Sequence, residues 1–540
     1  MSNLMQNALL DELHHDARTG DVLKARLLME SLGDFPPAFQ QQVFDELDLL
    51  APAFQADVFG YLLCGDDLQN ALTRAEISAA LLRVVLAEPL LLLSLLEDTS
   101  LVHRERLLDL FEGVPQSGLE VRLLKLIDGS DVAQELALYI RALGHLGVTS
   151  AVGALEEFLY SPDRRLVESA VLALGNIESI PAIDALGRRL GGDAQTDVLI
   201  MSRLARLATS HAIGYLVAQL GAASAYIRTR AKEHLIELGT HAIPLLIEAL
   251  DTMGGDALIH ALNVLAATRD ELAVAPIRHL LHDEPPNPNV RFAAYEALGM
   301  LPMRRGGYVL AGGLADPDAG VRLAAAVAIE RNLDDRLLAG LANMTRMDSG
   351  EAREVVIALV EGRAVQSVLG LIGKPVFVDM LVDILNGDTH PDTAQYFAQR
   401  LAASGAREVA ERLVVHRQVA SRKVIYAVDD SRMILSIYKS GLFALGYDVE
   451  VFEFPVQALD RMREALPLAL FTDLNMPELD GIALTRAIRR EFPDARLPIV
   501  MVTTQSEGGD AADAYDAGVD AILGKPFSKD DLARELDRLL

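Results

Sequence analysis

A unit of about thirty residues recurs through the middle of the chain, and it restricts this region to an architecture of stacked neighbours. Each copy begins with turn-forming or small polar residues and continues with apolar residues three and four positions apart, which predicts an amphipathic helix. The clearest copies are SPDRRLVESAVLALGNI from Ser161, SAYIRTRAKEHLIELGT from Ser224, NPNVRFAAYEALGML from Asn287 and DPDAGVRLAAAVAIERN from Asp316.

A Leu-Gly pair, or a pair of similar residues, marks the register of the repeat. The first residues of these pairs are Leu143, Leu174, Leu207, Leu238, Leu265, Leu298 and Ile329. Successive marks are 27 to 33 residues apart, and a second helical segment such as AVGALEEFLY or HAIPLLIEAL lies between them. We expect the Gly to form the left-handed C-cap of the first helix. One helix pair cannot bury its own apolar face, so the pairs must stack.

This pattern resembles the HEAT-repeat family, in a short form that is also similar to the repeats of bilin lyases. The resemblance covers residues 131–332, and it implies a solenoid whose curved face binds a partner protein. Residues 1–130 are helical by pattern and are interpreted as degenerate repeats or a cap. Residues 333–420 are interpreted as a helical region and a linker. An irregular helical bundle is the alternative.

Composition excludes several classes of function. The chain has 540 residues, which requires several domains or a repeat array, and its net charge of −28 disfavours a broad nucleic-acid-binding surface. Cys64 is the only cysteine, so no internal disulfide can form. The most apolar segment, residues 77–98, contains Arg83, Glu88 and Pro89, and therefore does not predict a membrane span. No membrane insertion and a cytoplasmic location are expected.

The pattern changes from helices alone to alternating strands and helices near residue 421. KVIYAV, DVEVF, LALFT, PIVMV and AIL are predicted strands, and a predicted helix follows each of them. Five such units predict an α/β doubly wound domain with a five-stranded parallel sheet over residues 421–540. The predicted fold is therefore an all-α repeat solenoid followed by a flavodoxin-like domain.

Charged and hydroxyl residues follow the predicted strands, where the working site of such a sheet lies. Asp429 and Asp430 end the first strand, Asp473 the third and Thr503 the fourth, and Lys525 follows the fifth. Clustered carboxylates repel one another unless a cation joins them, and Mg²⁺ prefers such oxygen ligands. A carboxylate beside Mg²⁺ can attack an activated phosphoryl group. A hydroxyl and an ammonium can then bind the phosphoryl oxygens.

The motifs VDDSRM, FTDLNMPELDG, VMVTTQ and GKPF resemble the signatures of response-regulator receiver domains. The offsets agree as well, because Asp473 lies 44 positions after Asp429, Thr503 lies 30 after Asp473, and Lys525 lies 22 after Thr503. The resemblance implies that Asp473 is the phosphoacceptor. It also implies that Asp430 and Asp473 bind Mg²⁺ directly and that Asp429 acts mainly through water.

The same resemblance assigns roles to residues around the acids. Asn475 would offer its backbone carbonyl to Mg²⁺, and Pro526 would follow a cis peptide bond. Asn475 and Gln505 would flank the path of the hydrolytic water. Thr503 would move toward the phosphoryl group paired with Lys525. The family often has an aromatic residue three places before this lysine, but Ile522 stands there, which weakens the expectation of an aromatic switch.

These observations predict a response regulator of a phosphorelay. A sensor histidine kinase would phosphorylate Asp473, and this would modulate the binding of an unknown protein partner to the solenoid. No enzymatic activity is expected beyond self-phosphorylation from small donors and autodephosphorylation. Two alternatives remain: a phosphate sink on a constitutive scaffold, and a bilin-lyase-like enzyme built on the repeats.

Overall fold

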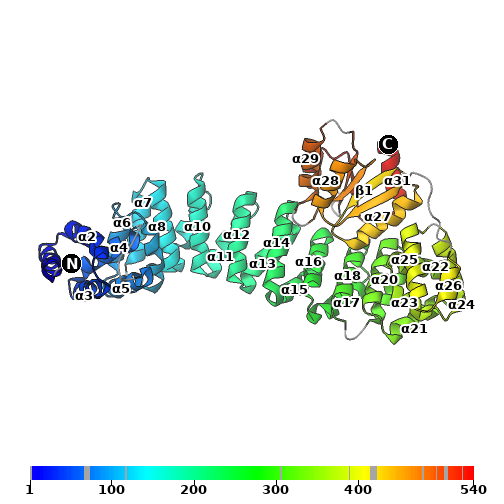
Figure 1. The fold of residues 1–540 in the computed structure, drawn as a ribbon, viewed down its shortest axis with the longest axis horizontal. Coiled ribbons are helices and arrows are strands. Elements are labelled where there is room, and N and C mark those ends of the chain that lie inside the picture. Colours follow the sequence, from blue (N-terminus) through cyan, green and yellow to red (C-terminus); the bar gives the residue numbers. More distant parts are fainter. Residues whose placement is uncertain are drawn as a thin grey trace. The chain divides into compact units, whose positions relative to one another are not determined.

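The computed structural model describes residues 3–65, 73–115, 118–303, 307–387, 389–413, 423–476, 479–493, 496–503, 509–525 and 527–540. The chain divides into two compact units, Met1–Leu207 and Ala208–Leu540. The described part of the first unit is helical. The second unit contains further helices and a five-stranded sheet (Figure 1).

The first unit is a succession of short antiparallel helices, most of them amphipathic. Its α-helices are α1 (Asn3–Thr19), α2 (Val22–Glu30), α3 (Pro37–Leu47), α4 (Pro52–Cys64), α5 (Arg74–Ala87), α6 (Leu90–Glu97), α7 (Leu119–Gly129), α8 (Ala133–Leu146), α9 (Val152–Phe158), α10 (Arg164–Ile177), α11 (Ile180–Arg189) and α12 (Ala194–Leu207). The 3₁₀ helices are η1 (Leu32–Asp34), η2 (Arg104–Gly113) and η3 (Thr149–Ala151). From α8 onward, alternate helices pack on one another, as stacked helix pairs require.

The helices of the second unit continue this alternation. They are α13 (Ser210–Ala218), η4 (Gln219–Gly221), α14 (Ala225–Leu238), η5 (Gly239–His241), α15 (Ile243–Thr252), α16 (Gly255–Thr268), η6 (Glu271–Ala273), α17 (Val274–His282), α18 (Pro288–Met300), α19 (Tyr308–Gly312), η7 (Gly313–Ala315), α20 (Ala319–Arg331), α21 (Asp335–Met344), α22 (Gly350–Glu361), α23 (Val365–Leu371), α24 (Pro375–Asn386), α25 (Pro391–Ala403) and α26 (Arg407–Glu411). Helices α14, α16, α18, α20, α22 and α24 pack consecutively and form one layer.

The expectation that the Gly of each Leu-Gly pair is a left-handed C-cap is wrong. Gly239 follows α14 with a φ of +54°, but its ψ of −122° is not that of a left-handed cap. Gly144, Gly175 and Gly299 lie inside their helices. A Cβ on Gly144 would lie 2.3 Å from the Cα of Ala173 in the next repeat, so this glycine permits close helix packing. The recurrence of glycine in the pattern therefore reflects close contact with the next repeat, which is backbone contact at Gly144 and Gly299 and contact with the Arg203 side chain at Gly175.

The sheet lies at the C-terminal end of the second unit, and its strands are all parallel. The strands are β1 (Val424–Val428), β2 (Asp448–Phe452), β3 (Leu470–Asp473), β4 (Ile499–Thr503) and β5 (Ala521–Gly524). Their order is β2-β1-β3-β4-β5. The helices between and after them are α27 (Arg432–Ala444), α28 (Pro455–Glu464), α29 (Gly481–Glu491), α30 (Gly509–Ala517) and α31 (Lys529–Leu539). This confirms the predicted doubly wound α/β fold.

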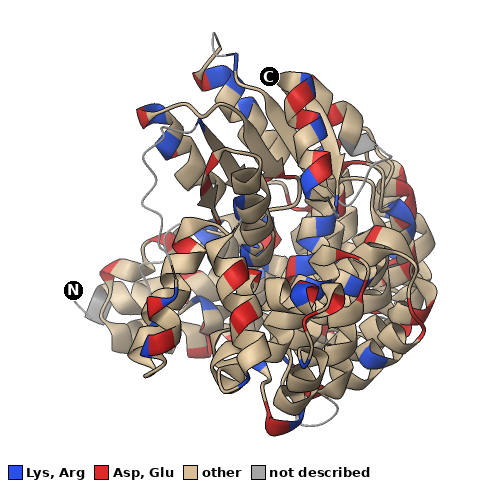
Figure 2. Ribbon diagram, turned by 90° about the vertical axis from the view of Figure 1, so that its right-hand side faces the viewer, with Lys and Arg blue, Asp and Glu red and all other residues tan. Residues whose placement is uncertain are grey.

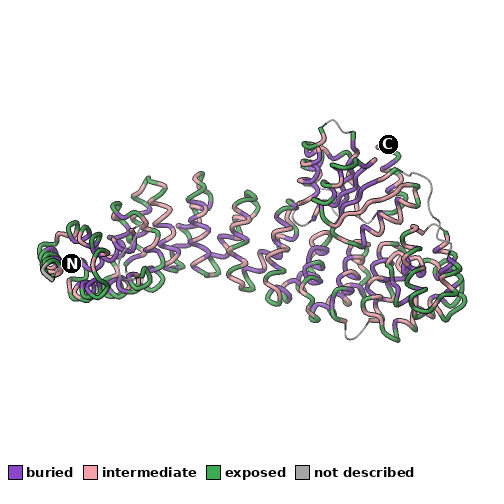
Figure 3. Tube along the Cα trace, viewed as in Figure 1, coloured by how far each residue is buried: buried purple, intermediate pink, exposed green. Residues whose placement is uncertain are grey.

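Each face of the sheet has its own apolar core, because alternate strand residues point to opposite faces. Helices α27 and α31 cover one face, where Tyr438 and Leu532 pack against Phe471. Helices α28, α29 and α30 cover the other face, where Met462 and Ile488 pack. Figure 3 shows buried residues along the strands and along the inner sides of the helices. This burial explains why β1, β3 and β4 are mostly apolar, whereas the half-buried edge strand β2 contains Asp448 and Glu450.

Within the second unit, the sheet domain packs against the layer of helices that precedes it. Helix α27 contacts α20 and α22 (Figure 1). The Ser436 hydroxyl on α27 donates to the carbonyl oxygen of Glu361 at 3.0 Å, and the Lys439 ammonium lies 2.5 Å from the Asp392 carboxylate. Phe292 of α18 packs against the core beneath α27. These contacts place α14, α16 and α18 beside the loops at the carboxyl edge of the sheet.

Charged residues of both signs occur throughout the helices. Figure 2 shows acidic and basic positions interspersed along the helices. No helix in the described ranges is both long enough and apolar enough to cross a membrane.

The contact at Gly144 predicts a stability effect that Gly153 should not share. Gly144→Ala should lower the free energy of unfolding by about 1–3 kcal/mol, because the added methyl group must displace the backbone of α10. Gly153 is exposed on α9 and has open space at the Cβ position, so Gly153→Ala should be neutral or stabilise by about 0.5–1 kcal/mol. Thermal unfolding followed by circular dichroism compares the two variants. Equal midpoints would contradict close packing at Gly144.

Candidate functional site

The topology of the sheet brings the predicted site residues to one edge. Strand β3 lies between β1 and β4 in the sheet. Asp429 and Asp430 follow β1, Asp473 is the last residue of β3, and Thr503 is the last residue of β4. Lys525 directly follows β5. Since parallel strands end at the same edge, side chains that are far apart in the sequence meet there.

A buried ammonium joins two of the three acids. The Lys525 Nζ atom lies 2.7 Å from Asp429 Oδ2 and 2.8 Å from Asp473 Oδ1. One carboxylate oxygen from each of Asp429, Asp430 and Asp473 lies within 4.8 Å of the others. Asp429 has no exposed surface and Asp473 is 6% exposed, whereas Asp430 faces the solvent side. The cluster therefore has a buried, cation-bound side and an open side.

Backbone groups hold the acids in place. The Ser431 N–H donates to Asp429 Oδ1 at 2.9 Å, and the Asn475 N–H donates to Asp473 Oδ2 at 3.2 Å. The Lys525 N–H donates to the Thr503 carbonyl at 2.7 Å, which connects the ends of β4 and β5. Each loop thus fixes the side chain that its own strand presents at the edge.

Gly481 allows the helix that follows β3 to start close to the end of that strand. A Cβ at this position would lie 2.2 Å from the carbonyl oxygen of Asp473, so only glycine allows the start of α29 to approach the end of β3 this closely. The Gly481 N–H also donates to the Leu474 carbonyl at 3.0 Å. Helix α29 is therefore anchored directly behind the acidic side chain.

The electrostatics of the cluster follow from burial and from the neighbouring charges. Burial raises the pKa of Asp429 to about 8, with Asp473 and Asp430 adding to the rise and Lys525 opposing it. Desolvation by the surrounding protein and then the charge of Asp473 raise the pKa of Asp430, although part of this residue is exposed. Burial alone would lower the pKa of Lys525, but Asp429 and Asp473 raise it above its ordinary value. The three acids together thus strongly favour a bound cation.

The donor set fits a hard divalent cation. Three carboxylates have oxygens within 4.8 Å of one another, so they can supply the one or two carboxylate ligands that Mg²⁺ usually takes beside its water ligands. The exposure of Asp430 leaves the cluster open on the side where water ligands would be held. Lys525 neutralises one of the three negative charges, so a net attraction for a cation remains.

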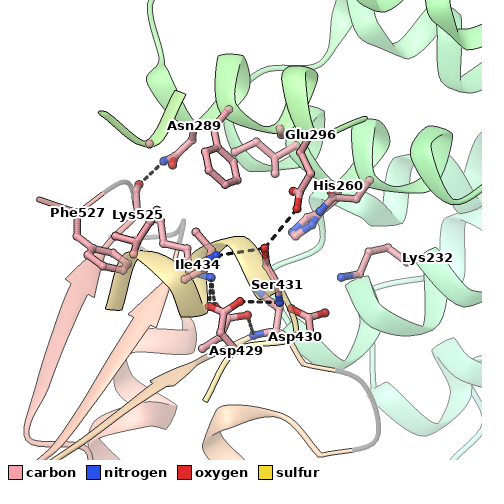
Figure 4. A pocket seen from close by; sticks show the side chains of 18 residues that line it. Lys232, His260, Asn289, Glu296, Asp429, Asp430, Ser431, Ile434, Lys525 and Phe527 are labelled. Carbon is pink, nitrogen blue, oxygen red and sulfur yellow. Dashed lines mark hydrogen bonds and ion pairs between the residues drawn. The ribbon is translucent and has the colours of Figure 1, made fainter. Parts of the chain in front are cut away.

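Helices α14, α16 and α18 form the opposite wall of this site within the second unit. A cavity of about 130 Å³ is lined by the three acids and Lys525 on one side, and by Lys232, His260, Asn289 and Glu296 on the other. Figure 4 shows Lys232, His260, Asn289 and Glu296 on the helices opposite Asp429, Asp430 and Lys525 of the sheet domain.

Direct hydrogen bonds connect α18 to the loops of the site. The Ser431 hydroxyl donates to Glu296 Oε1 at 3.2 Å, and Asn289 Nδ2 donates to the carbonyl oxygen of Lys525 (Figure 4). Burial raises the pKa of the Glu296 carboxyl, and Asp430 adds to this rise. The helices therefore contact the loops that carry the acids and the lysine.

The structure places some of the predicted site residues in the cluster and others elsewhere. Asp429, Asp430, Asp473 and Lys525 form one cluster, and Thr503 lies on the adjacent strand end. Asn475 lines the same cavity. Ile522 is half-buried and packs on the sheet face that carries α28, α29 and α30. Gln505 and Pro526 lie outside the described residues, and so does the peptide bond before Pro526.

Sequence reasoning missed the residues that the solenoid contributes. Arg228 and Lys232 are one helical turn apart on α14, and Arg228 is completely buried there. A basic residue among the apolar positions of an amphipathic helix was the available signal. It did not show which domain would cover that face, because the repeat pattern carries no information on the sheet domain.

Comparison with known proteins identifies two parts of the chain. Residues 425–537 match the response regulator receiver domain, and residues 243–330 match HEAT repeats. The response regulators MprA of Mycobacterium avium and Mycobacterium tuberculosis are each 35% identical over 116 residues, which are 22% of this chain and 50% of those proteins. The chain thus spans about half the length of the curated relatives it matches.

Solved structures that are similar to part of the chain include two receiver proteins. Chemotaxis protein CheY4 of Vibrio cholerae is 29% identical, with a TM-score of 0.22, and covers 22% of this chain and 100% of its own. The receiver domain of sensor histidine kinase PA1611 from Pseudomonas aeruginosa, which has a magnesium ion coordinated in its active site cleft, is 30% identical. It covers 22% of this chain and 98% of its own, with a TM-score of 0.21. The chain contains a response regulator receiver domain preceded by HEAT repeats.

Repulsion among the acids predicts that one of them destabilises the metal-free protein. Asp430→Asn should raise the free energy of unfolding by about 1 kcal/mol without Mg²⁺, because one negative charge leaves the cluster. Added Mg²⁺ should raise the unfolding midpoint of the wild type and should raise that of the variant much less. Calorimetry with and without Mg²⁺ measures both effects.

Asp537→Asn is the matched control, because Asp537 is exposed on α31 outside the cluster. It should leave the midpoint and the response to Mg²⁺ unchanged. An Asp430→Asn variant that responds to Mg²⁺ as the wild type does would contradict cation binding at the cluster.

Proposed function

We propose that this chain is a response regulator in which Asp473 accepts a phosphoryl group from a histidine kinase in a Mg²⁺-dependent reaction. The contact of Lys525 with both Asp429 and Asp473, beside the carboxylate of Asp430, is the observation that supports this function most strongly. This contact supports the proposal because it brings an ammonium to the carboxylate that would act as the nucleophile, beside the acids that would bind the cation.

The transfer step follows from the chemistry of these groups. A carboxylate oxygen of Asp473 attacks the phosphorus of a phosphohistidine, and an O–P bond forms while the P–N bond breaks. The electron pair of the broken bond remains on the imidazole nitrogen, and Asp473 becomes an acyl phosphate. Lys525 then binds an oxygen of the phosphoryl group, and Thr503 donates a hydrogen bond to another.

The metal-binding role belongs to the acids and one carbonyl. Asp429, Asp430, Asp473 and the backbone carbonyl of Asn475 would hold Mg²⁺, which supplies neutralisation of the charge that develops on the phosphoryl oxygens. Lys525 maintains the position of Asp473 through their ion pair. The N–H of Asn475 orients the second oxygen of the same carboxylate.

The output belongs to the HEAT repeats, because their helices already contact the site. We infer that phosphorylation changes the contact between the receiver and the solenoid, and through it the binding of a partner protein. Three hydrogen bonds support this route: those of Ser431 with Glu296, Asn289 with Lys525, and Arg228 with Asn475. A phosphate sink on a constitutive scaffold is the second candidate, and it requires no change in these contacts.

Phosphorylation of the full-length protein from phosphoramidate tests the acceptor. Wild type incubated with phosphoramidate and Mg²⁺ should gain one phosphoryl group in intact-protein mass spectrometry, and chelation of Mg²⁺ should remove this gain. Asp473→Asn should gain none, because an amide lacks the nucleophilic carboxylate. Asp460→Asn serves as the control, since Asp460 is an exposed receiver residue on α28. Undiminished phosphorylation of Asp473→Asn would overturn the assignment.

A further inference from the structure

The solenoid supplies a second ammonium to the cavity above the acids. Lys232 of α14 lines the cavity together with Asp430 and Asp473. Figure 4 shows its side chain extending toward Asp430. Within the described part of the chain, Lys232 forms no ion pair within 4.0 Å. Burial lowers its pKa, whereas Asp430 and Asp473 act to raise it. The ammonium therefore faces the acids across open space.

A buried imidazole beside Lys232 also lacks a partner. His260 of α16 is 4% exposed, and neither of its ring nitrogens has a hydrogen-bond partner among the described residues. It lines the same cavity (Figure 4). Burial, with a smaller contribution from Lys232, lowers its pKa to about 3, so the ring is neutral. An unpaired buried polar group is costly, and a ligand in the cavity would satisfy it.

Arg228 fixes the position from which Lys232 reaches the cavity. Its Nη1 donates to the carbonyls of Ala222 and Ala223, both at 2.8 Å, and its Nη2 donates to Asn475 Oδ1 at 3.2 Å. Asn475 lies two residues after Asp473. The start of α14 is thus connected to the loop that carries the phosphoacceptor, and Lys232 is one turn further along the same helix.

The charges on the two sides indicate which ligand this cavity fits. With all five groups ionised, as a bound cation favours, the carboxylates of Asp429, Asp430 and Asp473 exceed the ammoniums of Lys525 and Lys232 by one charge. A divalent cation would leave the site positive by one charge, and phosphorylation of Asp473 adds roughly one negative charge. The complete set is therefore close to neutral only when cation and phosphoryl group are both present. A volume of about 130 Å³ is sufficient for such a group with water.

We propose that Lys232 binds the phosphoryl group on Asp473 from the solenoid side, opposite Lys525, so that the phosphoryl site is shared between the two domains. This inference rests on the proposed function of Asp473. His260 contributes a neutral donor to the same site. The solenoid then senses phosphorylation at the phosphoryl group itself, which suits a receiver with Ile522 where an aromatic switch residue is common.

Beryllofluoride, a mimic of the phosphoryl group, tests this site in the full-length chain. Fluorine NMR measures its binding at a fixed Mg²⁺ concentration, and calorimetry measures Mg²⁺ binding alone. Lys232→Ala should weaken beryllofluoride binding by tenfold or more. The same variant should bind Mg²⁺ as tightly as the wild type or more tightly, because it loses a competing positive charge. A general loss of structure would weaken both ligands.

Lys232→Arg should retain most of the beryllofluoride affinity, because it keeps the cation. Lys374→Ala should match the wild type, since Lys374 is exposed at the start of α24. Beryllofluoride affinity within twofold of the wild type in Lys232→Ala would overturn the shared site, and so would an equal loss for beryllofluoride and Mg²⁺. If the wild type did not bind beryllofluoride, or if Asp473→Asn did bind it, the result would instead contradict the proposed role of Asp473 as phosphoacceptor.

Discussion

The ion pairs of Lys525 with Asp429 and Asp473 are the interaction on which the site depends. Two carboxylates, one of them fully buried and the other nearly so, are held close together by one ammonium. The arrangement requires β1 and β3 to be neighbours, with β4 and β5 following in order. Because the strands are all parallel, their carboxyl ends lie at one edge, and this order brings the ends of β1, β3 and β5 to one site.

The side chains that the solenoid contributes to the site are positioned by close packing of consecutive helices. In the layer that contains α18 and α20, a Cβ on Gly299 would lie 3.0 Å from the Cα of Ala328, so glycine permits this close approach. Equivalent faces of α14, α16 and α18 consequently lie in a row. Lys232, His260 and Glu296 come from these three helices, and together they form a wall that no single repeat could provide.

The sequence predicted the clustering of Asp429, Asp430, Asp473 and Lys525 because strand ends, residue types and offsets are all local signals. Asp429, Asp473 and Lys525 stand at the ends of short apolar runs that alternate with helical segments, a pattern typical of parallel strands, so their meeting was foreseeable. The leucine-glycine marks gave the correct repeat but the wrong role for glycine. Close contact between helices depends on the neighbouring repeat, which a capping rule does not consider.

The wall supplied by the solenoid was not predictable in the same way. Lys232 and His260 stand in different repeats, and no spacing between them marks a shared site. These two residues face a common site only because the receiver packs on the helix layer. That contact uses apolar side chains such as Phe292, which the sequence does not distinguish from ordinary core residues of a repeat. Buried polar residues on a solenoid face are therefore informative only once the covering domain is known.

Hydrogen–deuterium exchange of the full-length protein with Mg²⁺, with and without beryllofluoride, tests most directly whether the solenoid responds to the phosphoryl site. A shared site predicts slower exchange in α14 and α16 as well as around Asp473, and Asp473→Asn should abolish both changes. Slower exchange confined to the receiver, with α14 and α16 unchanged, would contradict the coupling and would favour a phosphate sink on a constitutive scaffold.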